Sequence, residues 1–166
     1  MRIVVIVVMG VSGAGKTTMG RALARRLAWP FHEGDDLHPA ESVRKMAGDE
    51  PLTDADRQPW LERIRGLAAR ESAEGQDVVV TCSCLKRAYR DLVREASETV
   101  RFVYLAIDPE TAGRRVGGRR GHFFDESLVA SQFETLEPPR RAVWLDATRP
   151  VEELVREATL RLGLAG

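Results

Sequence analysis

Apolar segments and amphipathic segments alternate along this chain. Residues 3–9 (Ile-Val-Val-Ile-Val-Val-Met) are apolar without interruption, as expected for a parallel strand that is buried on both faces. Four further short runs predict strands at 30–33, 78–82, 100–107 and 143–146. Helical patterns predict helices at 16–28, 40–47, 54–73, 85–96, 109–117, 126–136 and from Pro150 to Gly163. This alternation indicates βαβ units, so the expected fold class is α/β: three layers, with a five-stranded parallel sheet and helices on both faces.

Length and composition narrow the class of protein. The 166 residues are expected to form one domain over 1–166, because no repeat, low-complexity tract or long linker divides them. Hydrophobic residues make up 43% of the chain, and 25 Lys+Arg balance 25 Asp+Glu, which excludes an intrinsically disordered chain. The same balance argues against a nucleic-acid-binding protein, and no apolar run approaches the ~20 residues of a membrane span. Cys82 and Cys84 lie too close together to staple a fold, so a reducing cytoplasmic location is expected.

A glycine-rich segment follows the first predicted strand directly. Residues 10–17 read Gly-Val-Ser-Gly-Ala-Gly-Lys-Thr, which fits the phosphate-loop pattern G-x-x-x-x-G-K-[ST] without a mismatch. In this pattern backbone N–H groups surround phosphate oxygens, Lys16 reaches the β- and γ-phosphates, and the Thr17 hydroxyl binds Mg²⁺. The sequence therefore predicts a P-loop fold that binds ATP and Mg²⁺. The residues expected at the nucleotide are Gly10, Ser12, Gly13, Ala14, Gly15, Lys16, Thr17 and Thr18.

Two other segments carry charge suited to phosphoryl transfer. The acidic segment 33–39 follows the second strand, so its carboxylates should lie at the carboxyl edge of the sheet beside the phosphate loop. The alternative interpretation is a solvated acidic turn. The segment 114–120 places four arginines around two glycines, which is typical of a lid that closes over phosphates, or else of a basic surface loop. No aspartate ends the third strand, so Mg²⁺ is expected on Thr17, phosphates and water, with Asp35 nearby.

Several longer motifs extend over almost the whole chain, from residue 3 to about 155. They are Gly34-Asp35-x-Leu37-His38-Pro39, Asp56-Arg57-x-Pro59-Trp60-Leu61, Cys82-Ser83-x-Leu85-Lys86, Gly121-His122-Phe123-Phe124 and Ser131-Gln132-Phe133-Glu134. With these motifs the chain resembles the gluconate kinases (gluconokinases), a family of small P-loop kinases. The resemblance implies a homodimeric enzyme that transfers the γ-phosphoryl group of ATP to the 6-hydroxyl of D-gluconate, giving 6-phospho-D-gluconate and ADP.

The resemblance also assigns roles to residues. Lys16, Asp35 and Arg119 are the implied catalytic set, with Asp35 as general base or as a group that orients the acceptor hydroxyl. A lid at approximately 115–127 would bring Arg115 and Arg119 to the nucleotide, one near the adenine and one on the phosphates. The residues expected to bind gluconate are Asp35, His38, Arg57, Lys86, Arg90 and His122. Arg90 is the first choice for the carboxylate, because a guanidinium group can bind it bidentately.

Some alternatives remain open from the sequence alone. Kinases for shikimate or adenylylsulfate share the phosphate loop, but shikimate kinases carry Asp-x-Asp after the second strand and Gly-Gly-Gly after the third, and this chain has neither. A nucleotide-dependent switch without a small-molecule substrate is a rival from another class; it should hydrolyse ATP slowly without an acceptor. Trp60 either packs in the core or lines the substrate pocket.

Overall fold

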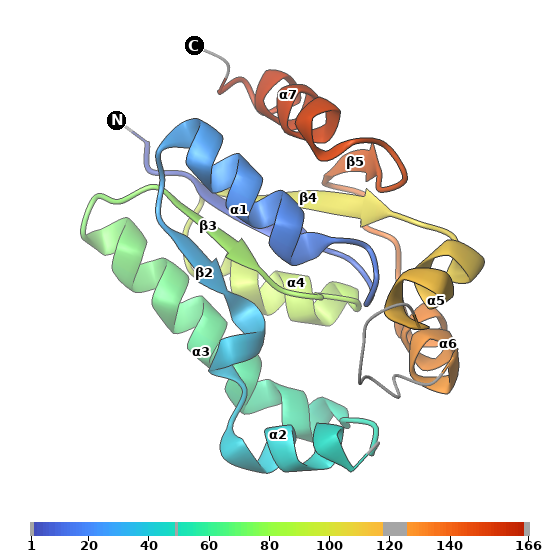
Figure 1. Cartoon of the computed structure of the whole chain (residues 1–166). Coiled ribbons are helices and arrows are strands. Elements are labelled where there is room, and N and C mark those ends of the chain that lie inside the picture. Colours follow the sequence, from blue (N-terminus) through green and yellow to red (C-terminus); the bar gives the residue numbers. More distant parts are fainter. Residues whose placement is uncertain (1, 49, 118–125, 165–166) are drawn as a thin grey trace.

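A single sheet of five parallel strands forms the centre of the molecule (Figure 1). The computed structural model describes residues 2–48, 50–117 and 126–164. The strands are β1 (Val5–Met9), β2 (Phe31–Glu33), β3 (Val78–Thr81), β4 (Val100–Ala106) and β5 (Val143–Asp146), in the spatial order β2-β3-β1-β4-β5. Val5 of β1 pairs with Val78 on one side and with Val100 on the other. The predicted α/β class with a five-stranded parallel sheet is confirmed.

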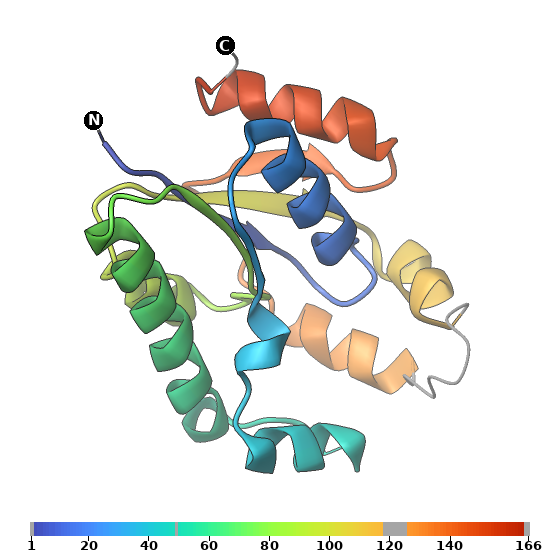
Figure 2. The same ribbon diagram turned by 60° about the vertical axis from the view of Figure 1, so that its left-hand side comes forward.

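Helices cover both faces of the sheet because successive strand residues point to opposite sides. The helices are α1 (Lys16–Leu27), α2 (Ala40–Ala47), α3 (Asp54–Ala73), α4 (Arg87–Arg94), α5 (Pro109–Gly117), α6 (Glu126–Thr135) and α7 (Val151–Arg161). On one face Ile6 and Val8 of β1 pack in a cluster with residues of α1 and α7. On the other face Val5 and Val7 pack with residues of α3 and α4 (Figure 2). The fully buried β1 therefore has an apolar core on each side.

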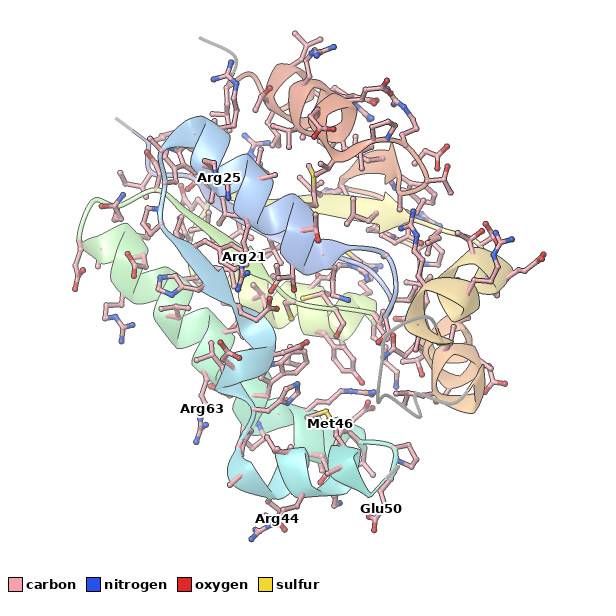
Figure 3. The ribbon with its side chains drawn as sticks, viewed as in Figure 1. Arg21, Arg25, Arg44, Met46, Glu50 and Arg63 are labelled. Atoms are coloured by element: carbon pink, nitrogen blue, oxygen red, sulfur yellow. The ribbon has the colours of Figure 1, made fainter. Side chains whose placement is uncertain are left out.

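The helix pair α2–α3 extends beyond the sheet. In Figure 3 Arg44, Met46 and Glu50 lie at the α2 end of the molecule, away from Arg25 on α1. Thr53 caps α3 by a capping box, in which its hydroxyl accepts from the Asp56 N–H and the Asp56 carboxylate accepts from the Thr53 N–H. Lys45 of α2 donates to both Asp56 carboxylate oxygens at 3.0 Å, which ties α2 to the first turn of α3.

Predicted and observed bounds agree at 40–47, 54–73, 109–117 and 143–146. The helix predicted at 85–96 spans only Arg87–Arg94, because Cys84 adopts a left-handed φ of 44° and Lys86 is extended. A short 3-10 helix, η1 (Gly34–Leu37), was not predicted. None of the helices in the described ranges is long and apolar enough to cross a membrane.

Candidate active site

The phosphate loop joins the end of β1 to the start of α1. Gly13 and Gly15 have φ angles of 87° and 89°, in the left-handed region that favours glycine. A Cβ atom on Gly13 would lie 2.6 Å from the carbonyl oxygen of Ala112, so a larger residue could not fit without a shift of the backbone. Lys16 opens α1, and its Nζ donates to the carbonyl oxygen of Val11 at 3.1 Å across the loop. The first N–H groups of a helix have no partner within the helix, so the start of α1 behind this loop favours an anion.

Two side chains from α5 and α6 hold the backbone of this loop. Gln132 accepts from the Ser12 N–H at 2.6 Å and donates to the Ser12 hydroxyl at 3.0 Å. Arg115 donates to the carbonyl oxygen of Gly13 at 3.3 Å and to that of Ala147 at 2.9 Å. Arg115, which the family resemblance places at the nucleotide, therefore lies beside the phosphate loop. Gln132 was not predicted as a site residue, although it lies in one of the motifs that carry the family resemblance.

Glu33, the last residue of β2, brings a carboxylate to the phosphate loop. One of its carboxylate oxygens accepts from the Thr17 hydroxyl and the other from the Thr81 hydroxyl, each at 2.5 Å. Thr81 ends β3, and its hydroxyl oxygen accepts from the Gly34 N–H at 3.0 Å. The hydroxyl that the phosphate-loop pattern assigns to Mg²⁺ therefore has a carboxylate neighbour, although no aspartate ends β3. That neighbour comes from β2 instead.

The next residues form the turn η1, which presents Asp35 beside this edge. The Asp35 side chain is 66% exposed, and its Oδ1 lies 3.9 Å from Nε2 of the buried His38. Two contacts of Trp60 support this turn. Its ring stacks on His38 with the ring centroids 4.1 Å apart, and its Nε1 donates to the carbonyl oxygen of Gly34 at 2.8 Å. Trp60 is 2% exposed, so it belongs to the core and at the same time holds the acceptor turn.

The protonation state of His38 follows from its surroundings. Burial lowers the pKa of His38 below its ordinary value, the charge of Asp35 opposes this shift, and the charge of Arg57 adds to it. His38 is therefore neutral at pH 7, and its buried Nδ1 has no hydrogen-bond partner among the described residues. With the proton on Nε2, Nδ1 is left as an unpaired acceptor. The 3.9 Å from Nε2 to Oδ1 of Asp35 is too long for a hydrogen bond, so His38 lies beside the Asp35 carboxylate without bonding to it.

A group of charged and aromatic side chains connects α3 to the start of α4. Lys86 donates to the two Asp54 carboxylate oxygens at 3.0 and 3.2 Å, and the Tyr89 hydroxyl donates to the same carboxylate. Arg57 donates to the Tyr89 hydroxyl oxygen at 3.1 Å. The hydrogen bonds from Tyr89 and Lys86 hold the pKa of Asp54 below its ordinary value, and the Asp54 carboxylate raises the pKa of Lys86. Both groups are therefore charged at neutral pH.

Arg57, Lys86 and Arg90 are the three candidate cations, that is, the basic residues predicted to bind the gluconate carboxylate. Arg90 has a different environment from the other two. It is 4% exposed, and its guanidinium group donates to the carbonyl oxygens of Cys84, Leu85 and Glu137 at 2.8, 3.2 and 2.8 Å. These bonds connect the β3–α4 loop to the segment after α6. The hydrogen bonds of Arg90, the first choice from the sequence, therefore hold the backbone, and Arg57 and Lys86 remain as the other basic residues predicted to bind gluconate.

Two predicted site residues, Arg119 and His122, and most of the predicted lid at 115–127 lie outside the described residues. Of the other predicted site residues, the structure brings the phosphate loop, Arg115 and Asp35 together along the carboxyl edge of the sheet. Thr81, Asp54 and Tyr89 were not predicted. Glu33 was predicted beside the phosphate loop only as part of the acidic segment 33–39, and not as a site residue by itself. For Glu33 a signal was available, because it ends a strand and stands two positions before Asp35.

A phosphate loop with a facing acidic turn, at the carboxyl edge of a parallel sheet, defines a P-loop kinase. Residues 5–139 match the protein family described as AAA domain. Gluconokinase from Gluconobacter oxydans is 46% identical over 134 residues, which cover 81% of this chain and 75% of that protein. A probable gluconokinase from Xenopus tropicalis is 40% identical over 171 residues, covering 92% and 90%. The chain therefore belongs to the gluconokinase family of small P-loop kinases.

A solved structure supports the same assignment. The crystal structure of a gluconokinase from Sinorhizobium meliloti 1021 superposes with a TM-score of 0.87 at 46% sequence identity, covering 98% of this chain and 93% of that one. The family that the motifs indicate is thus confirmed over nearly the full length of the chain.

Proposed function

We propose that this protein is a gluconokinase, which phosphorylates D-gluconate on its 6-hydroxyl with ATP. The O6 atom forms a bond to the γ-phosphorus, the bond from that phosphorus to the β–γ bridging oxygen breaks, and the O6 proton leaves. Family membership supports the activity. The observation that carries the mechanism is the position of Glu33 and Asp35, two residues apart where β2 leads into η1, with the Glu33 carboxylate bonded to Thr17 of the phosphate loop.

The nucleotide end of the site has the donors that ATP with Mg²⁺ requires. The loop N–H groups and Lys16 would hold the phosphates, and the hard oxygen donors of Thr17 and Glu33 suit Mg²⁺. No group of three or more His, Cys, Asp or Glu side chains converges as a metal site in the described ranges, so the ion would depend on the phosphates and water for its other ligands. When bound, Mg²⁺ neutralises charge that develops on the phosphates.

The acceptor end is the turn η1. We expect the exposed Asp35 carboxylate to accept a hydrogen bond from the 6-hydroxyl of gluconate and to receive its proton as the new bond forms. Trp60 would hold this turn, through its hydrogen bond to the Gly34 carbonyl oxygen and its stacking on His38. Because phosphoryl transfer depends mostly on alignment, the fixed position of this turn matters as much as the basicity of Asp35.

Other parts of the assignment stay predictions. Arg119 is expected on the γ-phosphate and His122 on a substrate hydroxyl, within a lid at approximately 115–127. Arg115 is expected at the nucleotide, which is consistent with its bond to Gly13. The homodimer is a prediction from the family resemblance, and the cytoplasmic location one from the cysteine content.

A coupled assay of ADP release across a panel of acceptors tests the proposed function. D-gluconate should stimulate ATP turnover, whereas shikimate, adenylylsulfate, AMP and D-glucose should not. Glucose lacks the carboxylate, and a charged binding group left without its partner discriminates strongly against such an analogue. Turnover of glucose within tenfold of gluconate would contradict the assignment, and ATP hydrolysis independent of any acceptor would favour the nucleotide-switch alternative.

A further inference from the structure

The side chains between α3 and α4 form an ordered chain of hydrogen bonds, with Asp54 in contact with Lys86 and Tyr89, and Tyr89 in contact with Arg57. Asp54 is ionised, so it can only accept hydrogen bonds. The single proton of the Tyr89 hydroxyl therefore points to Asp54, and the hydroxyl lone pairs face Arg57. Tyr89 is 6% exposed and cannot easily turn away. The Asp54–Tyr89 pair consequently fixes the direction in which the Arg57 guanidinium group points.

The three candidate cations differ in the donors they have left. The Lys86 ammonium group already forms an ion pair with Asp54, whose two carboxylate oxygens it contacts. The Arg90 guanidinium group donates to three carbonyl oxygens and is buried. Arg57 makes a single hydrogen bond from one of its five N–H donors, and no carboxylate pairs with it in the described part of the chain. Arg57 is half-buried, so a ligand can reach it.

Arg57 also lies toward η1, the turn that is expected to hold the phosphoryl acceptor. Its charge acts on His38, which in turn lies 3.9 Å from the Asp35 carboxylate. Its guanidinium carbon lies 5.6 Å from the centroid of the Tyr89 ring. A substrate with a hydroxyl at one end and a carboxylate at the other could therefore reach from Asp35 to Arg57.

We propose that Arg57 is the residue that binds the carboxylate of the sugar-acid substrate and so selects acids over neutral polyols, and that the Asp54–Tyr89 pair positions it. Asp54 and Tyr89 are positioning residues, because they act through Arg57. Lys86 then contributes by holding Asp54 and not by binding the substrate. This assignment rests on the proposed gluconokinase function.

Steady-state kinetics with two acceptors test the assignment. D-gluconate is compared with D-glucitol, the acyclic polyol in which the carboxylate is replaced by an uncharged CH₂OH group. The variants are Arg57→Gln, Tyr89→Phe and Lys86→Gln. Arg70→Gln is the matched control, because Arg70 is an exposed arginine of the same helix whose side chain forms no hydrogen bond or ion pair with the described residues. The KM for ATP and the thermal midpoint are measured for every variant.

For Arg57→Gln we expect kcat/KM for gluconate to fall by about 10- to 100-fold, the range for a lost charge-assisted contact, while kcat/KM for glucitol stays the same. Tyr89→Phe should raise the KM for gluconate by about 3- to 10-fold with little change in kcat, because Arg57 remains but is less well oriented. The KM for ATP should not change in either variant. A merely structural defect would instead lower the kcat/KM for both acceptors.

Lys86→Gln decides between the two remaining cations. We expect it to keep most of the preference for gluconate; if it removes that preference while Arg57→Gln retains it, Lys86 binds the carboxylate and the assignment is overturned. Preference retained in both variants would also overturn it, by placing the carboxylate elsewhere. A wild-type enzyme that does not phosphorylate gluconate would overturn the proposed function itself, which distinguishes that failure from failure of the assignment.

Discussion

Gly34 is the residue whose replacement should disturb this site most directly. It is buried where β2 turns into η1, against the end of β3. A Cβ atom added there would lie 1.8 Å from the backbone carbonyl oxygen of Thr81. Real Cβ atoms essentially never approach another heavy atom closer than 3.0 Å, so one of the two strands must move. A backbone carbonyl within a parallel sheet cannot rotate away as a flexible side chain can.

The expected loss of stability for Gly34→Ala is about 3–5 kcal/mol. Overpacking of a tight interior site costs about 1–3 kcal/mol. Separation of the strands also stretches the bond from the Gly34 N–H to the Thr81 hydroxyl, 3.0 Å, and the bond from Trp60 to the Gly34 carbonyl oxygen, 2.8 Å. Each of these hydrogen bonds contributes about 1 kcal/mol. The sum is a large fraction of the 5–15 kcal/mol that stabilises a typical domain.

Urea unfolding followed by circular dichroism measures this loss, and Gly66→Ala is the matched control. Gly66 lies within α3, and a Cβ atom on it would have no heavy atom within 4 Å. Alanine is favoured over glycine in a helix interior by about 0.8–1 kcal/mol, so Gly66→Ala should stabilise the protein by roughly that amount. The same substitution is therefore expected to have opposite signs at the two positions. A loss below about 1 kcal/mol for Gly34→Ala would refute the packing argument.

Two further substitutions separate chemistry from structure. Asp35→Asn should lower kcat by about 10²–10³-fold with little change in the thermal midpoint, because the amide cannot accept the hydroxyl proton, whereas Asp36→Asn should have a small effect. If Asp36→Asn abolished turnover while Asp35→Asn stayed within about threefold of wild type, the acceptor carboxylate would be Asp36. Arg90→Met should lower the unfolding free energy by about 3–5 kcal/mol, because it removes the charged donor of three carbonyl oxygens and a buried acceptor left without its partner costs about 1–3 kcal/mol. An unchanged unfolding free energy combined with a raised KM for gluconate would return Arg90 to the substrate site.

The sequence by itself determined the features that depend on neighbouring residues. The apolar run at 3–9 followed by the pattern from Gly10 to Thr17 specifies a buried strand, a loop and a helix within one short segment, and all three are present. Local signals also placed several helix ends, such as Pro109 in the first turn of α5. The helical pattern also predicted the bounds of α3, which spans Asp54–Ala73 as expected.

Only the tertiary structure decided which side chains meet across segments. The contact of Glu33 with Thr17 and Thr81 joins β2, α1 and β3, and it depends on β2 pairing beside β3. The position of Arg90 was not evident, because helical periodicity shows which face of α4 is buried but not that backbone carbonyls from two loops converge on it. The same limit applies to the Asp54–Tyr89–Arg57 chain, which exists because α3 packs against α4. A carboxylate, a guanidinium group or a hydroxyl has several possible partners in the sequence, and packing alone selects among them.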